Sequence, residues 1–402
     1  MKINLTAIWL CSFLFASQCV VFPATNLSTN ALNLLKKTQH NSLSCEQLNT
    51  STLVSQEFVD DNSLLNGNNQ NASFLFNPID VVIDQNGDLL IVDGGIVDGA
   101  PDLIRKLDIK TGMLSTIAGS GSGFSGDGDL ATKASLNLTS IAVDSQNNII
   151  LVDILTNRVR KIDAKSGIIS TIAGNGVADF SGDNDLAINA TLDSPISVFV
   201  DSKDNIIVTD MGNNRIRKID AQTKIISTIA GSGFSNFGGF SGDGGLATNA
   251  MLSSPVDAIV DSLGNLYISD RRNRRIRKVD VTGMINTIAG NGDFRPTGNG
   301  DLAINAGMEP GILAIRNDKT LFISSLIGGG FDDLSNTTEL RQVNLDTGII
   351  NQTIKKTNSK KALGFAGGLS ADTKNLFIAD VTNRRILKID SATKRVSVVK
   401  IK

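Results

Sequence analysis

The sequence predicts an all-β fold, a six-bladed β-propeller whose blades are four-stranded antiparallel sheets. The main observation is a repeat, because the segment Arg-Val-Arg-Lys-Ile-Asp at 158–163 occurs in six exact or looser copies. The copies end at Asp108, Asp163, Asp220, Asp280, Asn344 and Asp390. An apolar run precedes every copy, and Thr-Ile-Ala-Gly follows the first four. Units this small cannot bury their faces alone, so we expect six of them to pack radially around a pore.

Each unit is expected to contain four short strands. In the third unit they cover residues 196–200, 206–210, 215–220 and 225–230, and Asn, Gly and Asp separate them, which is typical of hairpins. The first run is almost entirely apolar, as in a strand that is covered on both faces. The third alternates charged and apolar residues, as in a strand nearer the exposed side of a blade. The 38 glycines against 7 prolines agree with many tight turns.

The N-terminal part of the chain differs from the repeats. Lys2 is followed by an apolar run from residue 3 to 15 and then by small and polar residues, so we expect residues 1–22 to be a signal peptide. Residues 23–50 form an expected linker rich in Asn, Ser and Leu, and residues 51–402 the propeller. Gln18 disfavours lipidation of Cys19. We therefore expect an exported protein, located in the periplasm, at the cell surface or outside the cell, with no later segment able to span a membrane.

The number of expected strands does not decide which strand closes the ring. The six units already end in a fourth strand at 396–401, yet residues 53–58 lie where the fourth strand of a preceding unit would lie. One strand is therefore surplus. We expect the N-terminal strand to pair with the last blade.

The repeats resemble those of a known family. The stretch from Ser227 to Asp280, with Ser-Thr-Ile-Ala-Gly, Gly-Phe-Ser-Gly-Asp-Gly and Arg-Arg-Ile-Arg-Lys-Val-Asp, is similar to the NHL repeat. The resemblance covers roughly residues 72 to 390. It departs from the pattern in the fifth unit, at Ser324 and in the insert 328–336. It implies a six-bladed propeller and says little about function.

Two recurrent polar features have structural explanations. The glycine-rich connectors, such as 123–129 and 239–245, lack the Lys-Ser/Thr of a phosphate loop and the final Glu of a calcium loop. We expect them to be turns in which an Asp caps one helical turn. The blade aspartates are expected to accept turn N–H groups and to face arginines of the next strand. These aspartates are Asp93, Asp153, Asp210, Asp270 and Asp380.

Positions that differ between blades are better candidates for a functional site. The family resemblance implies that the third residue of the pattern Pro-x-Gly-Val faces the channel. In blades one to six this position holds Asp80, Ser140, Ser197, Asp257, Ile312 and Gly367. Blades one and four are opposite each other, so Asp80 and Asp257 would face each other across the pore. With Ser140 and Ser197, these carboxylates suit a hard cation such as Ca²⁺ or a cationic ligand group, or they are simply hydrated.

Two further charged features are candidates, and the first of them, Glu309, lies near the predicted channel mouth. Glu309 directly precedes an inner strand. The densest basic cluster, Arg271, Arg272, Arg274 and Arg275, belongs to one turn and strand of blade four. It suits an anionic partner such as a polysaccharide or a lipid headgroup. The alternative is a solvated, charged strand that discourages edge-to-edge association.

Missing residue types narrow the function. His40, the single histidine, precedes the propeller, so no Ser-His-Asp or Cys-His arrangement fits inside it. Propeller lyases of related fold use histidine ligands, and gluconolactonase-like propellers depend on channel glutamates. The net charge of −2 makes a nucleic-acid partner unlikely. The sequence favours a non-catalytic scaffold that binds a protein, or an envelope or extracellular polymer. The alternative is a metal-dependent hydrolase, lactonase or lyase with its site in the channel.

Overall fold

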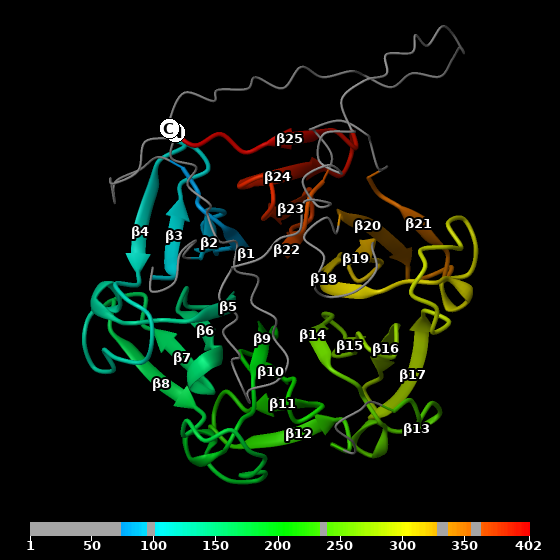
Figure 1. The fold of residues 1–402 in the computed structure, drawn as a ribbon, viewed down its shortest axis with the longest axis horizontal. Coiled ribbons are helices and arrows are strands. Elements are labelled where there is room, and N and C mark those ends of the chain that lie inside the picture. Colours follow the sequence, from blue (N-terminus) through cyan, green and yellow to red (C-terminus); the bar gives the residue numbers. More distant parts are fainter. Residues whose placement is uncertain (1–73, 95–100, 234–238, 328–336, 355–362) are drawn as a thin grey trace, which may run out of the picture. The chain divides into compact units, whose positions relative to one another are not determined.

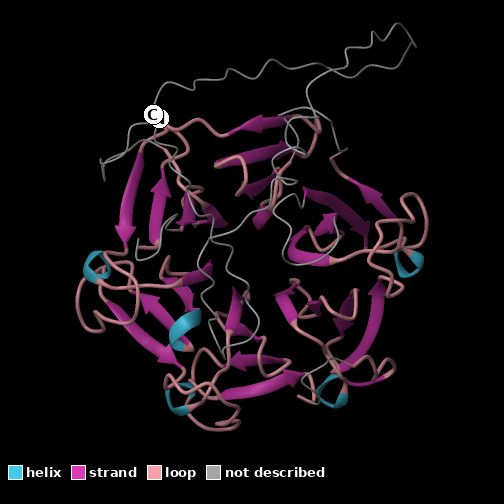
Figure 2. Cartoon of the chain, viewed as in Figure 1, coloured by secondary structure: helices cyan, strands magenta, loops and turns pink. Residues whose placement is uncertain are grey.

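The protein is described by a computed structural model, which covers residues 74–94, 101–233, 239–327, 337–354 and 363–402. Within these ranges the chain forms six antiparallel sheets arranged in a ring (Figure 1). Helical structure is limited there to five 3₁₀ segments of three residues, and Figure 2 shows those on the connectors between blades at the outer rim of the ring. The predicted signal peptide, linker and N-terminal strand lie outside the described residues.

The strands follow one another in chain order from the inner to the outer side of each blade. Their bounds are, in blade one, β1 (Pro78–Ile83), β2 (Leu89–Asp93), β3 (Leu103–Leu107) and β4 (Leu114–Ala118); in blade two, β5 (Leu138–Val143), β6 (Ile149–Asp153), β7 (Arg158–Ile162) and β8 (Ile169–Ala173); in blade three, β9 (Pro195–Val200), β10 (Ile206–Asp210), β11 (Arg215–Ile219) and β12 (Ile226–Ala230). Blade four contains β14 (Pro255–Val260), β15 (Leu266–Asp270), β16 (Arg275–Val279) and β17 (Met284–Ala289); blade five, β18 (Pro310–Arg316), β19 (Thr320–Ile327), β20 (Thr337–Asn344) and β21 (Ile350–Gln352); and blade six, β22 (Ala366–Ala371), β23 (Asn375–Asp380), β24 (Arg385–Asp390) and β25 (Val396–Val398). The 3₁₀ segments are η1 (Ala131–Lys133), η2 (Ile154–Thr156), η3 (Ala187–Asn189), η4 (Ala247–Asn249) and η5 (Ala303–Asn305).

The six blades and their four strands agree with the sequence prediction. In blade three the four expected runs coincide with β9 to β12 to within one residue at either end.

Across the described ranges, no helix has both the length and the apolar character needed to cross a membrane.

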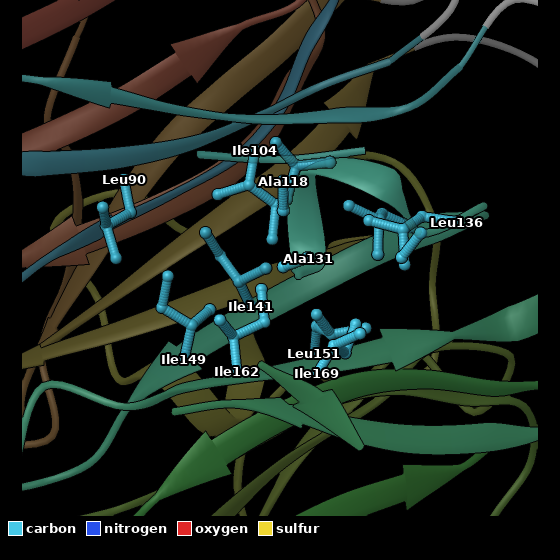
Figure 3. Close-up of a cluster of buried hydrophobic side chains, with 13 residues drawn as sticks. Leu90, Ile104, Ala118, Ala131, Leu136, Ile141, Ile149, Leu151, Ile162 and Ile169 are labelled. Carbon is cyan, nitrogen blue, oxygen red and sulfur yellow. The ribbon is translucent and has the colours of Figure 1, made fainter. Parts of the chain in front are cut away.

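The hydrophobic core lies between neighbouring blades. Figure 3 shows the cluster between blades one and two, in which Leu90 and Ile104 pack with Ile141 and Leu151. Alternate residues of one strand serve different interfaces, since Ile149 belongs to this cluster and Ile150 to the one shared with blade three. The blades are therefore stabilised by each other through buried apolar area.

The connectors between blades cover the outer strands. In blade two the N–H of Ala131, on the connector from blade one, donates to the carbonyl of Gly167, which lies just before β8, at 2.8 Å. The same bond recurs in blades three, four and five. In blade four the connector also forms a short fifth strand, β13 (Gly245–Leu246), against β17. Each outer edge covered in this way has fewer unpaired backbone groups open to another chain.

The ring closes where blade six meets blade one. There the C-terminal residues take the place of a connector, because the N–H of Lys402 donates to the carbonyl of Gly112 at 2.8 Å. Gly112 lies just before β4, as Gly167 does before β8. Val399 and Ile401 pack into the cluster that joins blades six and one. Closure in the described part of the chain therefore uses the C-terminal segment and contacts between β22 and β1.

Candidate functional site

Six inner strands surround the channel, and the predicted site residues of four of them form hydrogen bonds between blades. In β1, β5 and β14 a register shift lies directly before the channel position, between Pro78 and Asp80 for example. A bulge of this kind interrupts the ladder within the blade and redirects nearby groups. The backbone N–H groups of the residues that follow the channel position then donate to side-chain oxygens.

Asp80 links blade one to blade two. Its Oδ1 accepts the N–H of Val81 at 2.8 Å, and its Oδ2 accepts the N–H of Ile141, in the inner strand of blade two, at 2.9 Å. The side chain is buried, and this burial raises the pKa of Asp80 to about 7, with a smaller contribution from the charge of Asp257. Asp80 is therefore only partly ionised at neutral pH.

Asp257 repeats this arrangement on the opposite side of the ring. Its Oδ1 accepts the N–H of Ala258 at 2.9 Å and the hydroxyl of Ser197 at 2.5 Å, and its Oδ2 accepts the N–H of Leu313 at 2.8 Å. It therefore bonds to blades three and five. Burial raises the pKa of Asp257 to about 6. All four carboxylate oxygens of Asp80 and Asp257 thus accept hydrogen bonds within the protein.

The serines extend the same network. The hydroxyl of Ser140 accepts the N–H of Val198 at 3.3 Å, which joins blade two to blade three. At Ile312 the side chain is apolar, and the N–H of Ile312 donates to Ser324 Oγ at 2.7 Å instead. The predicted channel residues are therefore brought together, and in this structure they connect the inner strands to each other. Within the described residues, no three His, Cys, Asp or Glu side chains are grouped so that they could hold a metal ion.

The prediction of Gly367 for blade six was wrong by one residue. Ala366 pairs with Asp380 as Pro78 pairs with Asp93, which makes Gly368 the equivalent of Asp80. The sequence has no proline there to fix the register, so its two glycines could not be told apart. A Cβ on Gly368 would lie 2.7 Å from the Cα of Asp80. Glycine thus allows β22 and β1 to approach closely where the ring closes.

Glu309 and the basic cluster, which were predicted separately, are in contact. Arg271 Nη2 lies 3.3 Å from Glu309 Oε1, and both side chains are about 15% exposed. Arg274 donates to the carbonyl of Gly292 at 3.1 Å. Arg272 is partly exposed. The cluster therefore does not form one uniformly free cationic patch.

Arg275 shows a second use of the repeat arginines. It donates to the carbonyl of Asn273 at 2.6 Å, and its guanidinium lies 3.9 Å from the ring centroid of Phe240. Arg215 stacks in the same way on Phe180, at 3.5 Å. These stacks hold the connectors against the strands through cation–π contacts.

Buried arginines are the main feature that the sequence interpretation missed. The blade aspartates do face arginines as predicted, with Arg217 Nη1 3.2 Å from Asp210 Oδ2 and both side chains fully buried. The same arginine also reaches the connector, 2.9 Å from Asp183 Oδ1. Asp243 and Arg277 repeat this contact at the same separation of 34 residues. In blade two the equivalent pair, Asp127 and Arg160, is 33 residues apart, and this nearly constant spacing was a signal from which the pairs could have been found.

Comparisons with known proteins agree with this architecture. No protein-family model matches the chain. The protein SUPPRESSOR OF QUENCHING 1 of Arabidopsis thaliana is 30% identical over 138 residues, which are 33% of this chain and 12% of that protein. Human NHL repeat-containing protein 2 is 25% identical over 211 residues, 50% of this chain and 28% of that protein. A solved protein of unknown function from Bacteroides thetaiotaomicron has a TM-score of 0.53 at 16% identity, covering 78% of this chain and 69% of that one.

These matches and the blade geometry agree on the class of protein. Six four-stranded blades, five of which pair an arginine with a blade aspartate among the described residues, define a repeat β-propeller. Over about half of its length the chain is similar to proteins that contain NHL repeats, which supports an NHL-type repeat β-propeller. The matched segments are about an eighth and just over a quarter of the two relatives named above, so the fold is shared and the activities of those whole proteins are not implied.

Proposed function

We propose that this protein is an exported, non-catalytic scaffold that binds a partner protein on the face formed by its connectors. The central support is the use of the channel side chains. The carboxylates of Asp80 and Asp257 and the hydroxyl of Ser140 accept N–H groups of neighbouring inner strands. Groups engaged in this way stabilise the ring, whereas catalysis needs groups that reach a substrate.

The connector face carries residue types suited to binding a protein. Phe124, Phe240 and Phe294 are each more than 40% exposed, and arginines stack on their rings. Leu155, in the turn between β6 and β7, is 67% exposed. Aromatic and arginine side chains are enriched at the centres of protein interfaces. Export is supported by the basic residue and apolar run at the start of the sequence.

A capture experiment with a matched pair of variants tests the scaffold role. Leu155→Glu changes the connector face, and Leu263→Glu changes an equally exposed leucine, at 70%, in the turn at the opposite end of the blades. Tagged protein is used to capture partners from the cell envelope and the medium of the source cells. We expect one partner to be retained by the parent protein and by Leu263→Glu and lost by Leu155→Glu. Equal retention by both variants would refute docking on this face.

A channel enzyme is the second candidate, and the raised pKa of Asp80 favours it. A carboxyl with a pKa of about 7 can donate or accept a proton at neutral pH. In this alternative, Asp80 and Asp257, with Glu309 at the mouth, would hold Ca²⁺ for a hydrolase, lactonase or lyase reaction. Metal analysis of the purified protein separates the candidates. Tightly held calcium that is lost in the Asp80→Asn/Asp257→Asn double variant supports the enzyme, and its absence in the parent protein supports the scaffold.

A further inference from the structure

A hollow of about 660 Å³ lies between blades two and three, away from the channel carboxylates. Apolar side chains from both blades line it, including Ile150, Ile172, Ile206 and Ile219, and the lysines Lys161, Lys203 and Lys224 lie around it. Its volume is within the range of sites that bind small molecules, and it is larger than one side chain needs.

Beside the hollow, blade two lacks an aromatic ring that most other blades have. At this level of each blade, one residue of the inner strand lies opposite one residue of the second strand. In blade two the pair is Ala142 and Ile150. In blades three to six an aromatic residue takes part, and in blade one two larger aliphatic residues do. These pairs are Phe199 and Ile207, Ile259 and Tyr267, Ala314 and Phe322, Ser370 and Phe377, and Val82 and Leu90.

Blade four shows how the chain itself fills this position. The ring of Tyr267 is buried, its hydroxyl donates to Asp261 Oδ2 at 3.0 Å, and Lys278 Nζ lies 5.6 Å from the ring centroid. Blade two retains the equivalents of the two polar partners, Asp144 and Lys161, which form an ion pair at 3.2 Å. Blade two therefore has the lysine that would lie over an aromatic ring, but it has no aromatic residue at this position.

The charges around the hollow favour an anion. Its carboxylates are used within the protein, as Asp144 pairs with Lys161 and Asp204 accepts the hydroxyl of Ser145 at 2.6 Å. Asp220 caps its own turn by accepting the N–H of Thr223. Lys203, in contrast, is exposed and forms no ion pair within the described ranges. An anionic group at the rim would meet this ammonium without displacing an existing partner.

We propose that the hollow between blades two and three binds a small planar aromatic anion. The ring occupies the position that Tyr267 fills in blade four, over Ile150 and next to Lys161, and the anionic group is bound by Lys203. This site goes beyond the proposed scaffold role, because it binds a small molecule and does not require a protein partner, although Leu186 and Ile188 of the connector also line it.

The probe for the test is 8-anilinonaphthalene-1-sulfonate, which carries aromatic rings and one sulfonate, with neutral N-phenyl-1-naphthylamine for comparison. Ile150→Tyr adds the ring that blade four has, and Leu90→Tyr makes the same change in blade one, where Asp84 and Lys106 form the equivalent ion pair at 2.8 Å. Fluorescence titration of the folded parent protein should give saturable binding of about one probe. We expect Ile150→Tyr to weaken it by about tenfold or more, and Leu90→Tyr to leave it unchanged.

Two further variants complete the design. Ala142→Phe fills the same space from the inner strand, as Phe199 does in blade three, and replaces Ile150→Tyr if that variant does not unfold cooperatively. Lys203→Met should weaken the sulfonate probe by about fivefold and leave the neutral probe unaffected. The proposal is overturned if the folded filling variants retain the affinity of the parent protein. It is also overturned if folded Leu90→Tyr loses binding to the same extent, or if Lys203→Met changes both probes equally.

Discussion

The buried pair of Arg217 and Asp210 gives the sharpest prediction for stability. Both side chains are fully buried, and Arg217 also donates to Asp183 and to the carbonyl of Ser181 at 3.0 Å. Arg217→Met keeps an apolar stem of similar length and removes the charge. Asp210 then stays buried without its counter-charge, so we expect the free energy of unfolding to fall by about 3–5 kcal/mol at pH 8.

The physical cause can be separated from lost packing. Burial raises the pKa of Asp210 to about 6, so lowering the pH to 5 neutralises this carboxyl and should reduce the cost of Arg217→Met. The Arg217→Met/Asp210→Asn double variant should also cost less than the sum of the two single variants. Arg295→Met serves as the exposed control, because Arg295 pairs with Asp293 at 2.7 Å but is 72% exposed; its cost should stay below about 1 kcal/mol.

Equilibrium urea unfolding at pH 5 and pH 8 gives these values from the midpoint and slope. A loss for Arg217→Met close to that of Arg295→Met would contradict the argument. Such a result would mean that water or a rearranged connector compensates the buried carboxylate.

Three further predictions concern the channel and the closure of the ring. The pKa of Asp80 is about 7 in the folded protein and 3.8 for an unperturbed aspartate, so between these pH values the folded protein binds one more proton than the unfolded chain. The contribution of Asp80 to the free energy of unfolding therefore falls as the pH rises through this window, by up to about 1.4 kcal/mol per pH unit. Urea midpoints from pH 5 to 8 should therefore show a smaller pH dependence for Asp80→Asn than for the parent protein, and equal slopes would rule out the assignment. Gly368→Ala should lower the free energy of unfolding, measured by thermal unfolding, by about 1–3 kcal/mol, because the added Cβ would overlap β1. Gly245→Ala is the control and should cost less, since its Cβ would lie 3.3 Å from the nearest atom. The reverse order would contradict the close approach of β22 and β1. Removal of residues 400–402 deletes the hydrogen bond from Lys402 to Gly112, so we expect the melting temperature to fall by about 2–4 °C. Amide hydrogen exchange should become faster in β4 than in β8. Equal exchange rates in the two strands would show that the C-terminal residues are not needed to close the ring.

The blade plan was predictable because it rests on periodic local patterns. The apolar runs, the hairpin residues and the pairing of Asp210 with Arg217 recur in register, so each copy supports the others. The slip at Gly367 arose where the pattern lost its proline, since two adjacent glycines carry no side-chain signal for register.

The geometry between blades could not be read from the repeat. That Asp80 bonds to Ile141, or that Arg271 meets Glu309, depends on the angle and distance between separate sheets. The hollow beside Ile150 likewise follows from the sizes of side chains on two blades together. Nearest-neighbour packing decides such contacts, and a single sequence encodes it only indirectly.

The connector arrangement also bears on how the protein is made. Each outer strand from blade two to blade five is covered by residues that precede it in the chain, so its protection is already synthesised when it appears. Blade one differs, because the segment that reaches Gly112 is made only after all the other blades. Among the described residues, none that precedes blade one covers its outer strand, so we expect chaperones to engage the nascent chain at this edge and premature self-association to begin there.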